Sequence, residues 1–343
     1  MTLNSFNIFK IEDIFTMTRG ERQTEASREK GNVPYYSASQ DNNGVTGFIS
    51  NPTFTSKNKI VVSTFCHAYW AEGTFSASDE MTLLGHDKLN KYNALYICKI
   101  IEQNAHMYGF NRKAFSHRLK KQKIILPIKK DSSLDWEYME QQGKRLYERK
   151  QNDIFEYLKK KQLELKTQLS KINEPIIEEI TWKTFEVEEM FGVKRVSGEP
   201  LNKYDEGNLP FISTSSQKNG VQGFVNSKKE DVSPKNSLTI SPIDGTIFFH
   251  SYNFVGRGGA GSSISTMTNE NLNKYIGLFI KTMIEASSKH KASYGVQLNG
   301  KRLKSTKFYL PVTDDNEPDW KFMEYYMKKI EYKQISKLIK YLN

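Results

Sequence analysis

Hydrophobic residues recur three or four positions apart in two stretches of the chain, and this spacing predicts two long helices. The first begins near Trp136, where Ser133 or Asp135 can serve as the N-cap, and no proline follows before Pro175. Such a helix could run for about 39 residues, or about 58 Å. The second begins after Asp319 and is shorter. Both are longer than a helix that packs on its own domain needs to be.

The two apolar stripes can bury each other, because both belong to one chain. We therefore predict that the helices pair as an antiparallel coiled coil. The alternative is that each stripe packs only on its own domain. The expected helix-pairing residues are Phe155, Leu158, Leu165, Leu169 and Ile172 in the first helix and Met327, Ile330, Leu338 and Leu342 in the second.

The rest of the chain has short β-like runs, separated by glycine-rich and Asn-Gly turns. This pattern indicates compact β-rich domains. The clearest strands are expected at 59–64 and 123–127 in the first half and at 237–241 and 307–311 in the second. One helix is expected within each half, at 91–104 and 274–287.

An internal repeat relates the two halves. The motif Phe-x-Ile/Val-Glu-Asp/Glu-Ile/Met-Phe begins at Phe9 and again at Phe185, and Asn-Gly-Val-x-Gly-Phe begins at Asn43 and again at Asn219. Similar matches follow in the same order along the whole chain, so the protein contains two copies of one unit. The Asn-Gly motif by itself predicts a tight turn that leads into a strand.

The repeat divides the chain into four parts. Residues 1–131 and 180–316 form two β-rich domains, and 132–176 and 317–343 form the helices that follow them. The expected fold is α+β with pseudo-two-fold symmetry. The net charge is +11, of which residues 1–131 and 180–316 carry +6 and +4 and residues 132–179 and 317–343 carry −1 and +2. A basic excess placed on the globular domains favours an anionic partner, above all nucleic acid.

Other classes of protein fit the composition less well. Cys66 and Cys98 are too few for a disulfide framework and lack zinc-ligand spacing, so we interpret them as buried thiols. The six histidines also lack ligand spacing, and no metal site is expected. No apolar run has the length that spans a membrane, and residues 1–14 lack the apolar core of a signal peptide. We expect a cytoplasmic protein without membrane contact.

The repeated motifs resemble a target recognition domain. Besides the two motifs above, Gly-Asn-Val/Leu-Pro-Tyr/Phe begins at Gly31 and Gly207, and a Leu-Pro pair precedes each long helix. The order of domain, helix, domain and helix is similar to the specificity subunit of type I restriction-modification systems. It is equally similar to the specificity subunit of type IIB enzymes of the BcgI kind. The resemblance covers nearly the whole chain.

The resemblance implies a sequence-reading subunit without catalytic activity. Each recognition domain would read one half of a bipartite, asymmetric site in double-stranded DNA. The helices would dock two copies of a DNA adenine methyltransferase subunit, and a restriction subunit with nuclease and translocase activity could join them. This chain would bind no cofactor itself, because S-adenosylmethionine would be bound by the methyltransferase. The short second helix departs from the longest family members, which puts its docking surface in doubt.

Two segments are similar to motifs that carry chemistry in other proteins, but each match is incomplete. Asn51-Pro52-Thr53-Phe54 is similar to the motif with which methyltransferases grip a flipped adenine, but the second proline is missing and the second copy lacks the motif. The glycine-rich segment 256–261 is similar to a phosphate-cradling loop, but no Lys-Ser/Thr follows it. We interpret it as a recognition loop in which Arg257 faces DNA. We expect no catalytic residue.

The DNA-contacting residues are expected in polar, loop-like segments with basic and amide side chains. Arg and Asn can read guanine and adenine edges, whereas Lys more often meets phosphate. A match after Tyr-Gly aligns 111–113 with 299–302. The candidates are Arg19, Arg22, Asn111, Arg112, Lys113, His117 and Arg118 in the first copy and Lys194, Arg195, Arg257, Asn299, Lys301 and Arg302 in the second.

Two other functions remain open at this point. The chain could be a stand-alone duplicated DNA-binding or anti-restriction protein, which would have no methyltransferase partner. It could also be a β-rich repeat protein that binds carbohydrate or protein, which would not bind duplex DNA at moderate salt.

Overall fold

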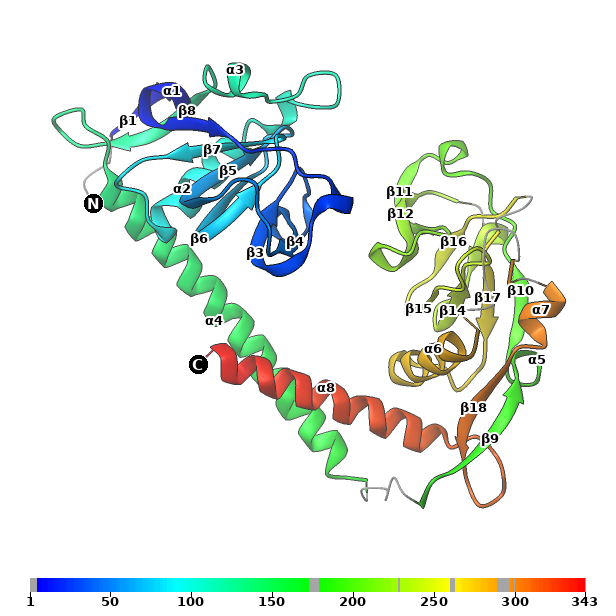
Figure 1. The fold of residues 1–343 in the computed structure, drawn as a ribbon. Helices are drawn as coiled ribbons and strands as arrows, with labels where there is room; N and C mark the ends of the chain where they lie inside the picture. Colours follow the sequence, from blue (N-terminus) through cyan, green and yellow to red (C-terminus); the bar gives the residue numbers. More distant parts are fainter. Residues whose placement is uncertain are drawn as a thin grey trace. The chain divides into compact units, whose positions relative to one another are not determined.

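The computed structural model describes residues 5–172, 179–227, 229–259, 263–288, 297–298 and 300–342. The chain divides into two units, Met1–Ile154 and Phe155–Asn343. Helix α4, Trp136–Leu169, crosses this boundary, so its first turns belong to the first unit and its last turns to the second. Each unit has its own sheets (Figure 1). Each also has its own hydrophobic core.

The first unit is built from two sheets and one covering helix. Its elements are β1 (Ser5–Lys10), α1 (Ile11–Ile14), β2 (Thr16–Arg19), β3 (Lys30–Tyr36), β4 (Val45–Ile49), β5 (Ser56–Ser63), β6 (Ala68–Ala77), β7 (Met81–Gly85), α2 (Lys91–Glu102), α3 (Ser116–Leu119), β8 (Lys123–Ile128) and the first turns of α4. Six strands form a sheet in the order β2-β7-β5-β6-β3-β4, and β1 pairs antiparallel with β8. Helix α2 buries Ala94, Ile97 and Ile101 in the core beneath it.

The second unit repeats this order of elements. They are β9 (Thr181–Glu186), α5 (Val187–Met190), β10 (Gly192–Arg195), β11 (Glu206–Ile212), β12 (Val221–Val225), β13 (Val232–Ser233), β14 (Ser237–Ile240), β15 (Ile247–His250), β16 (Phe254–Gly256), β17 (Ser265–Thr268), α6 (Lys274–Ser288), α7 (Gly300–Lys304), β18 (Lys307–Val312) and α8 (Trp320–Leu342). The strands form sheets β10-β17-β14-β15, β12-β11-β16-β13 and β18-β9.

Equivalent hydrogen bonds confirm the internal repeat. The main-chain N–H of Ser78 donates to the carbonyl oxygen of Tyr36 over 2.8 Å, and the N–H of Arg257 donates to that of Ile212 over 2.8 Å. Strand β3 pairs parallel with β6, and β11 pairs parallel with β16. In each pair the acceptor is the last residue of the first strand, and the donor is the residue that follows the second strand. The same topology is therefore formed twice.

The large sheet of the first unit is split in the second unit. The long strands β5 and β6 correspond to the pairs β13/β14 and β15/β16. Pro234, between β13 and β14, has no N–H to donate, and Asn236 has a positive φ of 54°. In the first unit Asn58 also has a positive φ, of 51°, but there the irregularity is absorbed as a register shift within β5.

The Asn-Gly motif forms the predicted turn in both units. Asn43 and Gly44 have φ values of 53° and 82° and lead into β4, and Asn219 and Gly220 have φ values of 56° and 76° and lead into β12. Asn and Gly tolerate this left-handed region better than other residues do. The helices predicted at 91–104 and 274–287 are confirmed as α2 and α6, and the four predicted strands as β5, β8, β14 and β18.

Within the second unit, the last turns of α4 pack against the end of α8. Leu165, Ile335 and Ile339 are buried there, and Phe155 and Leu158 pack against them. The Nε2 of Gln162 donates to Oγ of Ser336 over 2.8 Å. The two helices run in opposite directions and cross (Figure 1). This agrees with the predicted antiparallel pairing.

The contact is shorter than the predicted seam. Leu169 and Leu342 are half-buried, and the structure leaves Ile172, Ile330 and Leu338 at least one third exposed. Met327 packs instead on the core of the second domain. The physical reason is that the first turns of α8 are occupied by that core, which also buries Phe322 and Met323, so only its last turns reach α4. Helix α4 itself has 34 residues.

We find no helix with the length and apolar character needed to span a membrane among the residues that the structure describes.

Candidate nucleic-acid interface

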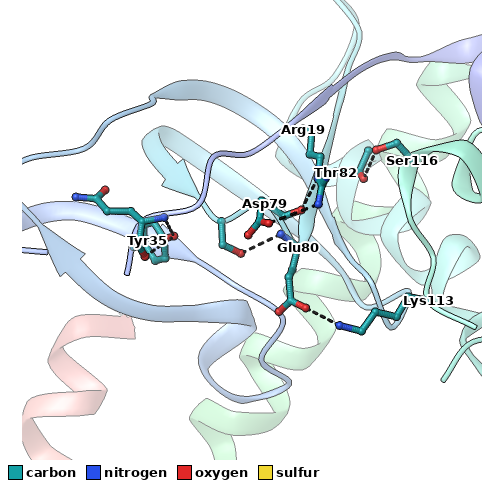
Figure 2. A network of polar contacts seen from close by, with 9 residues as sticks. Arg19, Tyr35, Asp79, Glu80, Thr82, Lys113 and Ser116 are labelled. Carbon is teal, nitrogen blue, oxygen red and sulfur yellow. Dashed lines mark hydrogen bonds and ion pairs between the residues drawn. The ribbon is translucent and has the colours of Figure 1, made fainter. Parts of the chain in front are cut away.

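Two loops of the first unit lie against each other and contain most of its candidate residues. One is the turn 78–80 between β6 and β7, and the other is the segment 109–118, which leads into α3. A hydrogen bond of 3.0 Å between the hydroxyls of Thr82 and Ser116 fastens the second segment to β7 (Figure 2). The main-chain N–H of Ala114 also donates to the carbonyl oxygen of Thr64 over 2.7 Å.

Arg19, at the end of β2, contacts both loops. Its Nε donates to the carbonyl oxygen of Asp79 over 2.6 Å, and its Nη2 lies 3.5 Å from Oδ2 of the Asp79 carboxylate (Figure 2). Its guanidinium carbon lies 5.5 Å from the centre of the Phe115 ring, within the range of a cation–π interaction. Arg19 therefore joins the turn 78–80 to the segment 109–118.

Lys113 makes a second link between the same loops. Its Nζ lies 2.7 Å from Oε1 of Glu80 (Figure 2). The ammonium group also lies 5.6 Å from the ring centres of Phe65 and Phe110 and 5.9 Å from that of Phe115. The side chain of Lys113 is only 22% exposed. Its charge is therefore largely compensated within the protein.

The segment before Lys113 forms a tight turn whose tip faces solvent. Gly109 and Arg112 exchange main-chain hydrogen bonds of 3.3 and 3.0 Å, so Phe110 and Asn111 lie at the tip. Phe110 is 83% exposed, and Asn111 and Arg112 are also exposed. These side chains offer an aromatic face, an amide and a guanidinium at one place on the surface.

His117 and Arg118, on α3, are exposed beside this turn. The ring of His117 stacks on that of Phe115, with 6.4 Å between the ring centres. Nη1 of Arg118 donates to the carbonyl oxygen of Lys113 over 2.8 Å. The structure thus brings the segment 111–118 together with Arg19.

Arg22 lies on a neighbouring part of the same surface. It lines a polar pocket of about 510 Å³ together with Arg28, Asp79 and Glu80. The guanidinium carbon of Arg28 lies 4.6 Å from the centre of the Tyr35 ring, which holds Arg28 at the pocket wall. Arg28 was not among the predicted candidates.

In the second unit, Arg195 occupies the position of Arg19. Its Nη2 donates to the carbonyl oxygen of Gly259 over 3.0 Å, just as Arg19 donates to a carbonyl oxygen in the corresponding loop. Equivalent main-chain hydrogen bonds show that Arg257 corresponds to Ser78 and Ile264 to Met81. The loop between them is therefore four residues longer in the second unit. The neighbouring Lys194 is exposed.

The glycine-rich segment does not begin as a phosphate cradle. The N–H of Arg257 donates to Ile212, and the N–H of Gly258 donates to the carbonyl oxygen of Gly198 over 2.7 Å. A phosphate cradle needs such donors free. The Arg257 side chain is half-buried, and residues 260–262 lie outside the described residues.

The predicted alignment of 111–113 with 299–302 is wrong. Arg118 donates to the carbonyl oxygen of Lys113 over 2.8 Å, and Arg302 donates to that of Gln297 over 2.8 Å, so Arg302 corresponds to Arg118. The second copy has two residues fewer between its Tyr-Gly pair and this arginine, and this shift misled the comparison.

Of the remaining candidates, Lys301 takes the place of His117 on the equivalent short helix α7, where Lys301 and Arg302 are both exposed. Asn299 lies outside the described residues.

Sequence reasoning missed the acidic half of the network in the first unit. Asp79 and Glu80 bind Arg19 and Lys113, and both cations lie within 6 Å of the centre of the Phe115 ring. The only signal in the sequence was an acidic pair in a short turn between two apolar strands. Such a pair is ordinarily interpreted as a solvated turn.

Asn51, in the segment similar to a base-gripping motif, has its amide engaged within the fold. Its Oδ1 accepts from the N–H of Glu29, and its Nδ2 donates to the carbonyl oxygen of Ser27, both over 3.0 Å. This arrangement closes the loop before β3. The segment therefore has a structural use in this chain.

The buried titratable groups do not form a reactive site. Burial raises the pKa of the Cys66 thiol to about 11 and also raises the pKa of Cys98. Burial lowers the pKa of His250 to about 4, and its Nε2 lies 2.8 Å from Oγ1 of Thr239. Within the described residues, no three His, Cys, Asp or Glu side chains are grouped so that they could hold a metal ion.

Comparison with protein families gives two matches within this chain. The family described as the type I restriction modification DNA specificity domain matches residues 4–156 and again residues 179–341. The first match contains the first globular domain and α4 as far as residue 156, and the second contains the second domain and α8 as far as residue 341.

A curated relative is similar over almost the full length. It is the specificity subunit S.BcgI of a type II restriction enzyme from Heyndrickxia coagulans, 26% identical over 98% of this chain and 97% of the relative. Among solved structures, the type I S subunit from M. genitalium matches 100% of this chain and 94% of its own, with 14% identity and a TM-score of 0.46. The HsdS subunit from Thermoanaerobacter tengcongensis matches 98% of this chain and 90% of its own, with 13% identity and a TM-score of 0.31.

Proposed function

Because the chain belongs to the type I restriction modification DNA specificity family, we propose that it reads a bipartite, asymmetric DNA target with one recognition domain for each half-site. The observation that carries this proposal is the duplication. The two copies share a topology and an arginine anchored on the same loop, yet they differ at the surface where that loop lies. Two related but different surfaces should read two different short sequences.

The charge of the chain supports duplex DNA as the ligand. The domains carry most of the net charge of +11, and exposed Arg112, Arg118, Lys301 and Arg302 lie on equivalent parts of the two copies. Lysine and arginine displace counterions from phosphates, so binding should weaken steeply with salt.

The chemistry in this proposal belongs to partners. Two copies of a DNA adenine methyltransferase would dock on the helices, and S-adenosylmethionine bound there would supply the methyl group. The partner would also flip the adenine out of the duplex. A restriction subunit would be required for cleavage. This chain would contribute the sequence readout and the docking surface.

Methylome sequencing of a host that expresses this chain with its neighbouring methyltransferase tests the proposal. We expect methylation within an interrupted, asymmetric site whose half-sites lie roughly 10 bp apart between centres, about one turn of DNA. A continuous recognition sequence, or a palindrome read by one domain alone, would contradict it. Affinity purification that brings down no methyltransferase would instead favour a stand-alone DNA-binding protein.

A further inference from the structure

We infer that the first recognition domain holds its DNA-contacting turn in place through an internal ion-pair network. Arg19 and Lys113 are positioning residues in this network, and Phe110, Asn111 and Arg112 at the tip of the turn make the contacts that discriminate bases. The inference rests on the proposed function and assigns roles within the first half-site.

Lys113 is poorly placed to bind a phosphate. Its ammonium group forms a 2.7 Å ion pair with Glu80 and is surrounded by three aromatic rings. A phosphate contact would have to displace the Glu80 carboxylate or add a second anion beside it. The 22% exposed side chain leaves little room for that. The ion pair with Glu80 instead holds Lys113, and the turn 109–112 that precedes it, against the loop 78–80.

Arg19 holds the other side of the same structure. It donates to the main chain of Asp79 and lies beside its carboxylate, while its guanidinium packs near Phe115. Figure 2 shows Arg19, Asp79, Glu80 and Lys113 following one another across the two loops. The ion pair of Lys113 with Glu80 joins the two loops directly, and Arg19 joins them a second time through Asp79 and the Phe115 ring.

The tip of the turn has the opposite character. The paired main chains of Gly109 and Arg112 fix the backbone, while Phe110, Asn111 and Arg112 extend into solvent. A backbone that is already fixed loses little conformational entropy when the side chains that it presents bind a partner. Arginine and asparagine can each form two hydrogen bonds to a guanine or an adenine edge. An exposed phenylalanine can contact a thymine methyl group or insert between bases.

The second copy keeps only part of the network. Arg195 still donates a hydrogen bond to a loop carbonyl oxygen, as Arg19 does. The residue that corresponds to Lys113 is Gln297, and the residue that corresponds to Glu80 is Ser263. The anchoring arginine is thus common to both copies, and the ion pair between Glu80 and Lys113 belongs to the first. The readout of the first half-site should therefore depend on this pair, and that of the second should not.

The experiment uses the full chain assembled with its methyltransferase. Binding is measured from low to high salt on two duplexes of equal length. One contains the target sequence that methylome sequencing identifies, and the other has a random sequence. The variants are Lys113→Met, Glu80→Gln, Arg112→Ala and Phe110→Ala, with the charge-exchanged pair Glu80→Lys/Lys113→Glu as the rescue. Lys130→Ala, which removes an exposed lysine from the loop after β8, is the control.

We expect Lys113→Met and Glu80→Gln to weaken binding to the target by about 10-fold or more while binding to the random duplex and its salt dependence stay unchanged. The exchanged pair should recover most of the loss. Arg112→Ala and Phe110→Ala should reduce discrimination at base pairs of the first half-site only, by about 10-fold each.

Other results would overturn the inference. If Lys113 contacts phosphate, Lys113→Met lowers the slope of log affinity against log salt by about 0.9 on both duplexes, and Glu80→Gln strengthens binding to both. Unchanged discrimination in Arg112→Ala and Phe110→Ala would remove the role of the tip. Absence of any methylated target for the unmodified chain would be a failure of the proposed function, and the salt slope on the random duplex would still test the role of Lys113.

Discussion

Gly143 of α4 shows how closely the first unit is packed at the scale of single residues. A Cβ atom at this position would lie 2.0 Å from the carbonyl oxygen of Tyr92 in α2. Gly143→Ala must therefore move the two helices apart, at a cost of about 1–3 kcal/mol. That cost exceeds the roughly 1 kcal/mol that alanine gains over glycine inside a helix. We expect urea denaturation to show a lower midpoint for this variant.

Gly47→Ala, in β4, is the matched control, because a Cβ atom there meets no atom within 4 Å. Equal stability of the two variants would show that α2 and α4 do not approach as closely as the structure indicates.

His250 should make the stability of the second unit depend on pH. Burial lowers its pKa to about 4 in the folded protein, whereas an unfolded histidine titrates near 6.5. Between these values the unfolded chain binds a proton that the folded chain does not. Unfolding should therefore become easier as the pH falls from about 6.5 to about 4, by up to about 1.4 kcal/mol per pH unit.

Urea denaturation of the unmodified chain and of His250→Gln at several pH values measures this difference. His106→Gln, which removes an exposed histidine from the first unit, is the control. A His250→Gln variant with the same pH dependence as the unmodified chain would contradict the assignment.

At the scale of elements, the crossing of α4 and α8 depends on few side chains. Leu165 is fully buried between them, while Leu163 on the same helix is 65% exposed. We expect Leu165→Ala to destabilise the second unit by about 2–5 kcal/mol, because it removes apolar contacts and leaves a cavity. Leu163→Ala should change stability by no more than about 0.5 kcal/mol. Thermal unfolding of both variants measures the difference, and similar melting temperatures would argue against the crossing.

Helix α7 makes a prediction about the second half-site. Lys301 and Arg302 are exposed on it, and Arg302 is held by its hydrogen bond to the carbonyl oxygen of Gln297. The double variant Lys301→Ala/Arg302→Ala should weaken binding at the second half-site and reduce its salt dependence. The control is Lys129→Ala/Lys130→Ala, two exposed lysines after β8 in the first unit, which should bind as before. Normal binding and methylation by the α7 variant would show that this helix does not face DNA.

At the scale of the whole molecule, the repeat predicts how a fragment behaves. A chain that ends near Pro175 keeps the first recognition domain and α4 but loses Ile335 and Ile339, which cover Leu165. Exposed apolar surface of this kind tends to associate. A second copy of the fragment is the natural replacement, so the fragment should dimerise about a two-fold axis. Such a dimer, with methyltransferase supplied, should mark a palindromic form of the first half-site.

Light scattering of the fragment and methylome sequencing measure these two outcomes. A fragment that remains a soluble monomer, or one that still marks the asymmetric site, would show that the two units are not equivalent.

The sequence alone determined the duplication and most of the local elements. Helices α2 and α6 and the turns at Asn43 and Asn219 were predictable, because side-chain periodicity and the left-handed preference of Asn and Gly act within a few residues. The family followed from the order of the motifs, which requires no three-dimensional information.

Tertiary structure decided the rest, because the deciding contacts join distant residues. The ion pair of Glu80 with Lys113 spans 33 positions, and no local pattern distinguishes it from two solvated charges. The correspondence of Arg302 with Arg118 is shown by equivalent hydrogen bonds, although Arg-Leu-Lys at 118–120 and 302–304 also indicates it in the sequence. The length of the contact between α4 and α8 was set by how much of α8 the second domain covers. A stripe along a helix cannot reveal this, since it shows which residues can be buried and not what buries them.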